Sequence, residues 1–284
     1  MLQRSLGPRA VSAIGLGAMP MSIEGRPDEA RSLATIHAAL DAGITLIDTA
    51  DAYHLEAGEV GHNERLIAKA LKAYGSGAAD VVVATKGGHL RPGDGSWTQD
   101  GSPQHLLEAA HASSERLGGP IGLYYYHRPD PKVPYADSIG ALKQLLDEGT
   151  IELAGVSNAS VEQIDIARDI LGDKLVAVQN EFSPSHLSTL IEMEHCAALD
   201  IAFLPWSPLG GIRGASALGG RHTVFQEVAD AHGVSPQQVA LAWELALAEV
   251  VIPIPGASRP ESITDSAKAV DLVLTDDELA KLSA

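Results

Sequence analysis

The chain has 284 residues, 45% of them hydrophobic, and carries a formal net charge of −17 at pH 7. This length suits one large domain, so we expect a single domain over residues 1–284. The negative charge argues against a nucleic-acid partner, because phosphates demand a basic face, and no apolar run approaches the roughly 18–20 residues of a membrane span.

The first half of the chain alternates between short apolar strands and helical patterns. Residues 3–6 and 11–12 flank a Gly-Pro pair and predict a small β-hairpin, and residues 13–19 predict a strand that enters a glycine-bearing loop. Apolar strands then end at Asp48, Lys86 and His127. Helical patterns lie at residues 30–42, 63–73 and 103–117, and a glycine-rich excursion occupies residues 87–102.

The second half continues the same alternation. Apolar runs predict strands at residues 151–156, 175–178, 201–204 and 250–253. A loop rich in Gly, Ser and Arg is expected at 208–222. Helical patterns lie at residues 135–147, 160–171 (with Ser160 as N-cap), 187–199, 224–232, 236–248, 260–269 and 276–282.

The strands number about eight, and each is followed by a helical pattern. Strands that are apolar on both faces are typical of a parallel sheet covered by helices. The sequence therefore predicts an α/β fold, a (β/α)₈ TIM barrel with a small N-terminal β-hairpin. The alternative is a doubly wound sheet, but Gly15-Leu16-Gly17 lacks the third glycine and the later acid of a dinucleotide-binding fingerprint.

Polar residues stand where apolar strands end, which is the face that carries the active site of a barrel. Asp48, Lys86 and His127 each end a strand, and Tyr53 lies on the loop after Asp48. An ionisable group buried there must be paired. A lysine ammonium favours phenolate and so should lower the pKa of Tyr53, while the aspartate keeps the lysine charged. A histidine could then polarise a substrate carbonyl.

These residues and their surroundings resemble the catalytic tetrad of the aldo-keto reductases. The matching stretches include DTADAY at 48–53, TK at 85–86, LYYYHRPD at 123–130, GVSN at 155–158, VQNEFS at 178–183 and PWSPLG at 205–210. The resemblance extends from Gly15 to about Ser266. It implies a (β/α)₈ barrel that binds a nicotinamide cofactor without a Rossmann fold and transfers a hydride between this cofactor and a carbonyl.

The resemblance also implies roles for individual residues. Tyr53 would be the general acid, tuned by Lys86 and Asp48, and His127 would orient the carbonyl. Ser157, Asn158 and Gln179 would bind the nicotinamide carboxamide, and Trp206 would stack on the ring. The remaining positions implied to bind cofactor, including Asp48, are Gly17, Ala18, Met19, Ser207, Pro208, Leu209, Gly210, Gly211, Arg213, Gly256, Ala257, Ser258, Arg259, Ser262 and Ser266.

The sequence departs from the family pattern at the adenosine end. Many relatives place a lysine near Gly256 and an arginine near Ser262 to hold the 2′-phosphate. Here Ser258, Arg259 and Ser262 would have to serve, at the start of a helix that could bind an anion. We expect NADPH as the cofactor, with NADH not excluded.

Three other functions fit parts of the pattern. Lys86 could form a Schiff base in an aldolase-type barrel, although an adjacent Asp48 would hold it charged. A metal-dependent hydrolase would use some of the eleven histidines, but none shows a ligand spacing such as His-x-His. The barrel could also be a cofactor-binding redox sensor with little turnover, like the potassium-channel β subunits that resemble this family, although all four tetrad residues are present.

The substrate is the least defined part of the prediction. Specificity in barrels depends on the βα loops. We expect a small carbonyl substrate, an aldehyde, a ketone or a sugar, and Ser96-Trp97 after Lys86-Gly87-Gly88 is similar to pyridoxal-reductase-like members. The lone Cys196 and the absence of a signal-peptide core near the start favour a cytoplasmic protein. We expect it to be a monomer.

Overall fold

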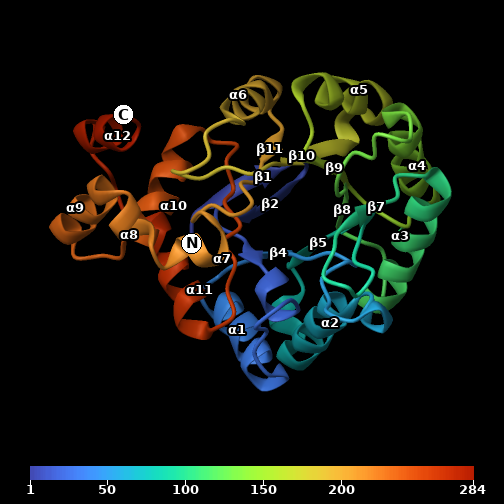
Figure 1. Cartoon of the computed structure of the whole chain (residues 1–284), viewed down its shortest axis with the longest axis horizontal. Coiled ribbons are helices and arrows are strands. Elements are labelled where there is room, and N and C mark those ends of the chain that lie inside the picture. The colour runs from blue at the N-terminus through green and yellow to red at the C-terminus, as the bar shows by residue number, and fades with distance from the viewer.

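The computed structural model describes residues 1–284, apart from the side chain of Arg213. Seven parallel strands form one curled sheet in the order β11-β10-β9-β8-β5-β4-β3, and helices surround it (Figure 1). The strands are β3 (Leu16–Gly17), β4 (Leu46–Asp48), β5 (Val82–Gly87), β8 (Leu123–Tyr126), β9 (Ala154–Ser157), β10 (Leu175–Gln179) and β11 (Ala202–Phe203).

Residues 250–256 close the sheet into a barrel. They form a parallel bridge between Val251 and Phe203 on one side and another between Gly256 and Gly17 on the other. The segment contains two prolines, which have no N–H to donate, so it cannot form a continuous ladder. The prediction of a regular strand at 250–253 is therefore wrong, but the eighth position of the predicted TIM barrel is filled.

The helices form a ring outside the strands (Figure 1). Their amphipathic patterns bury one face against the sheet. All ten predicted helices are confirmed, with ends that differ by at most three residues: α1 (Glu29–Asp41), α2 (His62–Tyr74), α3 (Pro103–Leu117), α4 (Tyr135–Glu148), α5 (Val161–Leu171), α6 (Leu190–Leu199), α9 (Thr223–His232), α10 (Pro236–Leu247), α11 (Pro260–Ala267) and α12 (Asp276–Leu282).

The predicted N-terminal hairpin is confirmed as β1 (Gln3–Leu6) and β2 (Arg9–Ser12). Leu6 and Val11 are fully buried in the cluster of apolar side chains that fills the barrel. The Gly7 turn lies against Val176 near the start of β10, where an added Cβ would be only 2.4 Å from the valine. The hairpin therefore closes the N-terminal end of the barrel and leaves the opposite end for a site.

Two predicted loops contain regular structure. The excursion at 87–102 holds an antiparallel pair, β6 (His89–Leu90) and β7 (Thr98–Gln99). The loop expected at 208–222 contains two short helices, α7 (Gly211–Ala215) and α8 (Leu218–Arg221). Two-residue strands and four- or five-residue helices are too short for a hydrophobic period to indicate them.

Candidate active site

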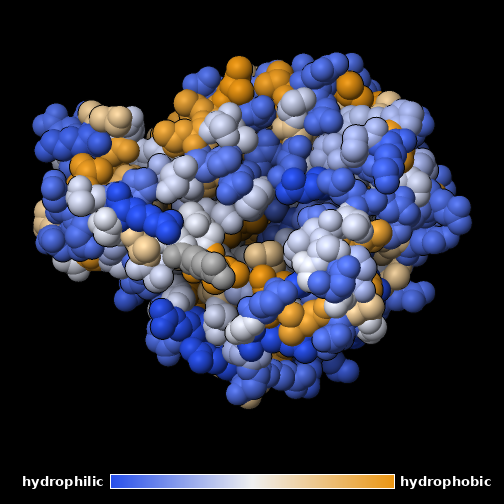
Figure 2. All heavy atoms as spheres, viewed as in Figure 1, coloured by the Kyte–Doolittle hydropathy of each residue, from blue (hydrophilic) through white to orange (hydrophobic). Residues whose placement is uncertain are grey.

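A cavity of about 1130 Å³ opens where the strands end, and Figure 2 shows this face of the molecule hollowed near its middle. Its volume is somewhat above the usual range for ligand pockets, roughly 300–1,000 Å³, which suits a dinucleotide together with a second molecule. Most of the residues singled out in the sequence line it: Gly17, Met19, Asp48, Tyr53, His127, Ser157, Asn158, Gln179, Trp206, Ser207, Pro208, Leu209, Gly211, Gly256, Ala257, Ser258, Arg259, Ser262 and Ser266.

Four predicted positions differ from this group. Lys86 is fully buried and lies beneath the cavity floor rather than on its surface. Ala18 packs into the core, and its carbonyl accepts a hydrogen bond from Asn63 Nδ2 at 2.9 Å. Gly210 caps the start of α7 without lining the cavity. The side chain of Arg213 lies outside the described part of the chain, so its predicted contact with cofactor stays a prediction.

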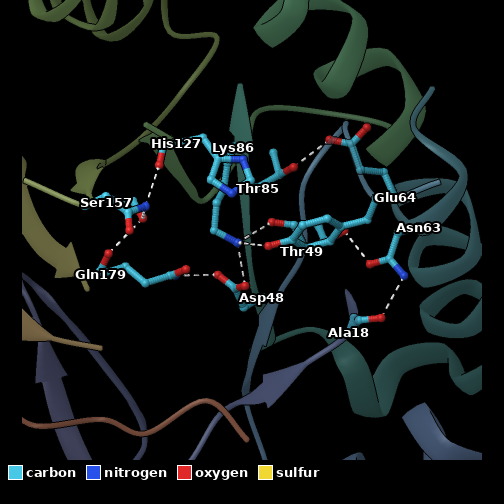
Figure 3. Close-up of polar contacts among 12 residues, drawn as sticks. Ala18, Asp48, Thr49, Asn63, Glu64, Thr85, Lys86, His127, Ser157 and Gln179 are labelled. Atoms are coloured by element: carbon cyan, nitrogen blue, oxygen red, sulfur yellow. Dashed lines mark hydrogen bonds and ion pairs between the residues drawn. The ribbon is translucent and has the colours of Figure 1, made fainter. Parts of the chain in front are cut away.

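Three oxygen atoms surround the ammonium group of Lys86 (Figure 3). Its Nζ lies 2.5 Å from Asp48 Oδ1, 2.8 Å from the Thr49 carbonyl oxygen and 3.1 Å from Tyr53 Oη. Asp48 ends β4 and Lys86 lies in the neighbouring strand β5, so the parallel register brings them together. The lysine therefore links the aspartate to the phenol, as the sequence predicts.

The electrostatics of this group differ in one respect from the expectation. Burial lowers the pKa of Lys86, but Asp48 and Tyr53 outweigh burial and raise that pKa overall, so the ammonium form is favoured. Burial raises the pKa of Tyr53 by more than Lys86 lowers it. The expected net lowering of the Tyr53 pKa is therefore wrong for this geometry, because desolvation disfavours the phenolate. Tyr53 is held in its protonated form near neutral pH.

A second set of hydrogen bonds connects the base of the cavity to strands β9 and β10. Gln179 Nε2 donates to Asp48 Oδ2 at 2.7 Å, and Ser157 Oγ donates to the Gln179 carbonyl oxygen at 2.7 Å. Asn158 Nδ2 donates to the His127 carbonyl oxygen at 3.0 Å. Burial raises the pKa of Asp48, while Lys86 and Gln179 oppose that rise. The predicted carboxamide-binding residues thus also orient the tetrad.

The His127 ring faces Tyr53, with ring centroids 5.9 Å apart and the planes nearly perpendicular. Its Nδ1 is buried without a hydrogen-bond partner among the described side chains. Burial, and then the charge of Lys86, lower the pKa of His127 well below its usual value. The ring is therefore neutral at pH 7 and has one N–H to donate.

A buried polar network behind the tetrad could not be identified from the sequence. Thr85 Oγ1 donates to Glu64 Oε1 at 2.6 Å, and Arg116 Nε donates to Glu64 Oε2 at 2.5 Å. Thr49 Oγ1 donates to Asn63 Oδ1 at 2.5 Å. These bonds fix strands β4 and β5 against helices α2 and α3, and so hold Asp48 and Lys86 in register.

Further cavity residues come from the β6–β7 pair. His89, Trp97 and Gln99 line the cavity beside His127. The rings of His89 and Trp97 stack with centroids 4.7 Å apart, and the His89 ring meets that of His127 edge-on at 4.9 Å. Both residues lie in the glycine-rich excursion at 87–102, where the sequence singled out Trp97 but not His89.

The opposite end of the cavity contains the predicted adenosine site. Arg259 is exposed, and its Nε donates to Ser262 Oγ at 2.7 Å. Two carboxylates, Glu261 and Asp265, line the same end, and Ser235 Oγ donates to Asp265 at 2.6 Å. Ser235, the N-cap of α10, and the two acids on α11 were missed because the patterns of these helices carry no ligand motif.

No group of three His, Cys, Asp or Glu side chains in the described residues is arranged to hold a metal ion. In the same part of the chain, none of the helices has the length and apolar character required to cross a membrane.

The sequence profile of the Aldo/keto reductase family matches residues 13–284. The chain belongs to this family, and the predicted resemblance is confirmed. An uncharacterized oxidoreductase of Schizosaccharomyces pombe is 34% identical over 282 residues, covering 98% of this chain and 87% of the relative. A 6-dehydroglucose reductase of Novosphingobium aromaticivorans is 34% identical over 270 residues, covering 92% and 87%.

Solved structures of the family share the fold. The glycerol dehydrogenase of Gluconobacter oxydans superposes with a TM-score of 0.83 at 26% identity, covering 99% of this chain and 94% of that one. An aldo/keto reductase of Klebsiella pneumoniae, solved with NADP and acetate, superposes with a TM-score of 0.81 at 26% identity, with the same coverage. These matches confirm the TIM-barrel fold, and the chain is an oxidoreductase of this family.

Proposed function

We propose that the chain is an NADPH-dependent carbonyl reductase with Tyr53 as general acid. The observation that carries this proposal is the position of Lys86 Nζ, in contact with both Asp48 and Tyr53 Oη beneath the cavity floor. A buried ammonium beside a phenol stabilises the phenolate that forms when the phenol gives up its proton. The protonated Tyr53 can donate its proton, and Lys86 lowers the free energy of the phenolate that results.

The remaining roles follow from position. A neutral His127 would donate a hydrogen bond to the substrate carbonyl and so hold it beside Tyr53 Oη. Asp48 keeps Lys86 charged and in place, and Gln179 fixes the second oxygen of Asp48. A bound reduced nicotinamide would supply the hydride. The proton and the hydride would then reach the carbonyl oxygen and carbon respectively, which gives an alcohol.

The described residues fit a nicotinamide dinucleotide. The cavity is continuous from the tetrad to Arg259. Two of its non-glycine residues, Asn158 and Ser207, have φ angles of 56° and 54°. Left-handed backbone is uncommon in such residues and tends to occur where a ligand is bound. Asn158 and Ser157 would hold the carboxamide, Trp206 would lie against the ring, and Arg259 would meet the 2′-phosphate.

The proposed acid can be tested with a Tyr53→Phe variant. We expect kcat for aldehyde reduction to fall by about 10²–10⁴-fold, because the variant has no proton to donate. Binding of NADPH, followed by nicotinamide fluorescence, should be retained because the ring framework is unchanged. Turnover close to that of the wild-type chain would contradict the assignment. The substrate panel should include oxidised sugars, because one relative is named a 6-dehydroglucose reductase.

Cofactor preference can be tested at Arg259. An Arg259→Ala variant should bind NADPH several-fold more weakly, with a smaller effect at high salt because the arginine is exposed. Its affinity for NADH should change little, since NADH has no 2′-phosphate. Equal losses for the two cofactors would contradict the proposed phosphate contact, and tighter binding of NADH by the wild-type chain would contradict the NADPH preference.

The Schiff-base alternative is not favoured by this geometry. A lysine that forms an imine must be neutral and must reach the substrate. Lys86 is paired with Asp48, its pKa is raised, and it does not line the cavity.

A further inference from the structure

One cavity residue has no role in the proposed hydride and proton transfers. Arg128 directly follows His127, lines the cavity and is half-buried. Its terminal nitrogen donates a long hydrogen bond of 3.4 Å to Asn158 Oδ1. Its Nε is buried and has no hydrogen-bond partner among the described residues. Leaving a guanidinium nitrogen unbonded is unfavourable, so the side chain has unused capacity to bind a ligand.

No carboxylate of the described residues neutralises Arg128. The other cations near the carbonyl end are already paired, Lys86 with Asp48 and Arg91 with Glu24. Arg91 also donates to the His54 carbonyl oxygen, and it does not line the cavity. Arg128 is therefore the unneutralised positive charge among the described side chains that line this end of the cavity, in a chain with a net charge of −17.

The position of Arg128 in the chain puts its positive charge near the place proposed for the reacting carbonyl. The Cα atoms of adjacent residues are about 3.8 Å apart, so Arg128 begins next to the histidine proposed to hold the carbonyl. Arg128 lines the same cavity as His127 and His89, whose ring centroids are 4.9 Å apart. Asn158 holds the guanidinium from one side. A negative group on the substrate, a few bonds from its carbonyl, would meet the guanidinium.

We propose that Arg128 binds an anionic group of the substrate, a carboxylate or a phosphate, and that the chain is selective for negatively charged aldehydes or ketones. Arginine forms two parallel hydrogen bonds with such groups, which gives orientation as well as affinity. The stacked pair of His89 and Trp97 would pack against the apolar part of the same substrate. This inference rests on the proposed carbonyl reductase function.

The test uses pairs of aldehydes that differ mainly in charge. The first pair is 4-carboxybenzaldehyde and its methyl ester, and the second is glyceraldehyde 3-phosphate and glyceraldehyde. With saturating NADPH, we expect the wild-type chain to show at least a tenfold higher kcat/KM for the charged member of one pair. The pair that responds distinguishes a carboxylate from a phosphate. Equal values within both pairs would overturn the inference without any variant.

Two variants then test whether Arg128 causes the preference for charged aldehydes. Arg128→Gln should lower the charged-to-neutral ratio at least tenfold, mainly through KM, while Lys132→Gln should preserve the wild-type ratio. Lys132 is an exposed control on the same loop that does not line the cavity, and its loss changes the net charge equally. An equal loss for both members of a pair in Arg128→Gln would show that Arg128 only positions Asn158, and would overturn the inference.

The same measurements separate the two proposals. A wild-type chain that reduces none of the four aldehydes with either cofactor overturns the reductase function, and the inference with it. A chain that reduces them with no preference for charge leaves the reductase function in place and overturns only the role of Arg128.

Discussion

Lys86 is the residue on which the site depends most, because it is fully buried and its charge is balanced within the protein. Asp48 provides the balancing carboxylate, and Tyr53 and the Thr49 carbonyl accept its other hydrogen bonds. A buried ion pair of this kind is weak evidence of net stability, because desolvation offsets most of the attraction. Its value here is that it holds a positive charge beside the phenol.

A double-mutant cycle tests this interpretation of the Lys86–Asp48 pair. Lys86→Met leaves Asp48 buried without its partner, so we expect the free energy of unfolding to fall by about 3–5 kcal/mol. The double variant Lys86→Met with Asp48→Asn should be more stable than Lys86→Met alone, because no unpaired charge remains. Urea denaturation of these two variants and of Asp48→Asn alone measures the three losses that the cycle compares. Losses that simply add would contradict the coupling, and reductase activity should be absent in both variants.

The tetrad could be predicted because three of its members stand at strand ends that periodicity locates, and Tyr53 lies on the loop after one of them. Asp48, Lys86 and His127 end apolar runs, and barrel geometry brings those ends together. The net pKa of Tyr53 could not be predicted, because it depends on the balance between burial and the charge of Lys86. Arg128 belongs to the LYYYHRPD stretch at 123–130, but its place in the cavity, like that of His89, depends on contacts between elements that the stretch does not indicate. The proposed catalytic roles stay predictions until variants are measured.

The β6–β7 pair is the element that most shapes the carbonyl end of the cavity. Trp97 stacks on His89, and the guanidinium carbon of Arg91 lies 4.9 Å from the centroid of the Trp97 ring. Arg91 in turn pairs with Glu24, which connects this excursion to the loop after β3. An isolated two-residue hairpin is not stable in water, so these contacts determine its position.

A Trp97→Ala variant tests whether this hairpin forms a substrate wall. We expect KM for aromatic aldehydes to rise about tenfold or more, with a smaller change in kcat, because the tetrad does not contact Trp97. Hydrogen exchange at residues 89–99 should become faster as the stacking is lost. Trp97→Phe retains an aromatic face and should recover most of the affinity. An unchanged KM in Trp97→Ala would contradict the role of the hairpin in binding.

Element boundaries were predicted best where the chain carries its own stop signals. Ser160 accepts a hydrogen bond from the Gln163 N–H and forms a capping box, as its position before an apolar period indicates. Helix α6 begins at Leu190, whereas the prediction placed its start at residue 187. The N-cap residue Thr189 makes no side-chain hydrogen bond to the helix, so no capping signal marked the start. The last strand position was misread as a regular strand because its prolines interrupt the ladder. Local chemistry thus determines boundaries more reliably than hydrophobicity alone.

At the scale of the whole molecule, the barrel results from many local preferences, each weak by itself, that favour the same arrangement of strands and helices. Parallel strands, covering helices and a plug at the N-terminal end leave the opposite end open for chemistry. The sequence could predict this arrangement because the alternation covers nearly the whole chain. The assignment of residues 1–284 to a single domain, the monomeric state and the cytoplasmic location stay predictions.

Glu244 links the stability of the whole fold to pH. It is fully buried on α10, and neither carboxylate oxygen has a hydrogen-bond partner among the described residues. Burial raises its pKa well above the ordinary value, so the folded state favours the protonated form. The stabilising effect of that proton is complete below the unfolded pKa of about 4.3 and is lost as pH rises toward the folded pKa.

A Glu244→Gln variant removes this titration while keeping the shape of the side chain. The variant and the wild-type chain should have similar free energies of unfolding near pH 4. The variant should become progressively more stable than the wild type as pH rises to 8, because only the wild type must keep a proton or bury a charge. Urea denaturation across this range measures the difference, and subtracting the two curves cancels other buried acids such as Asp51. A difference that does not vary with pH would mean that Glu244 does not titrate in this range.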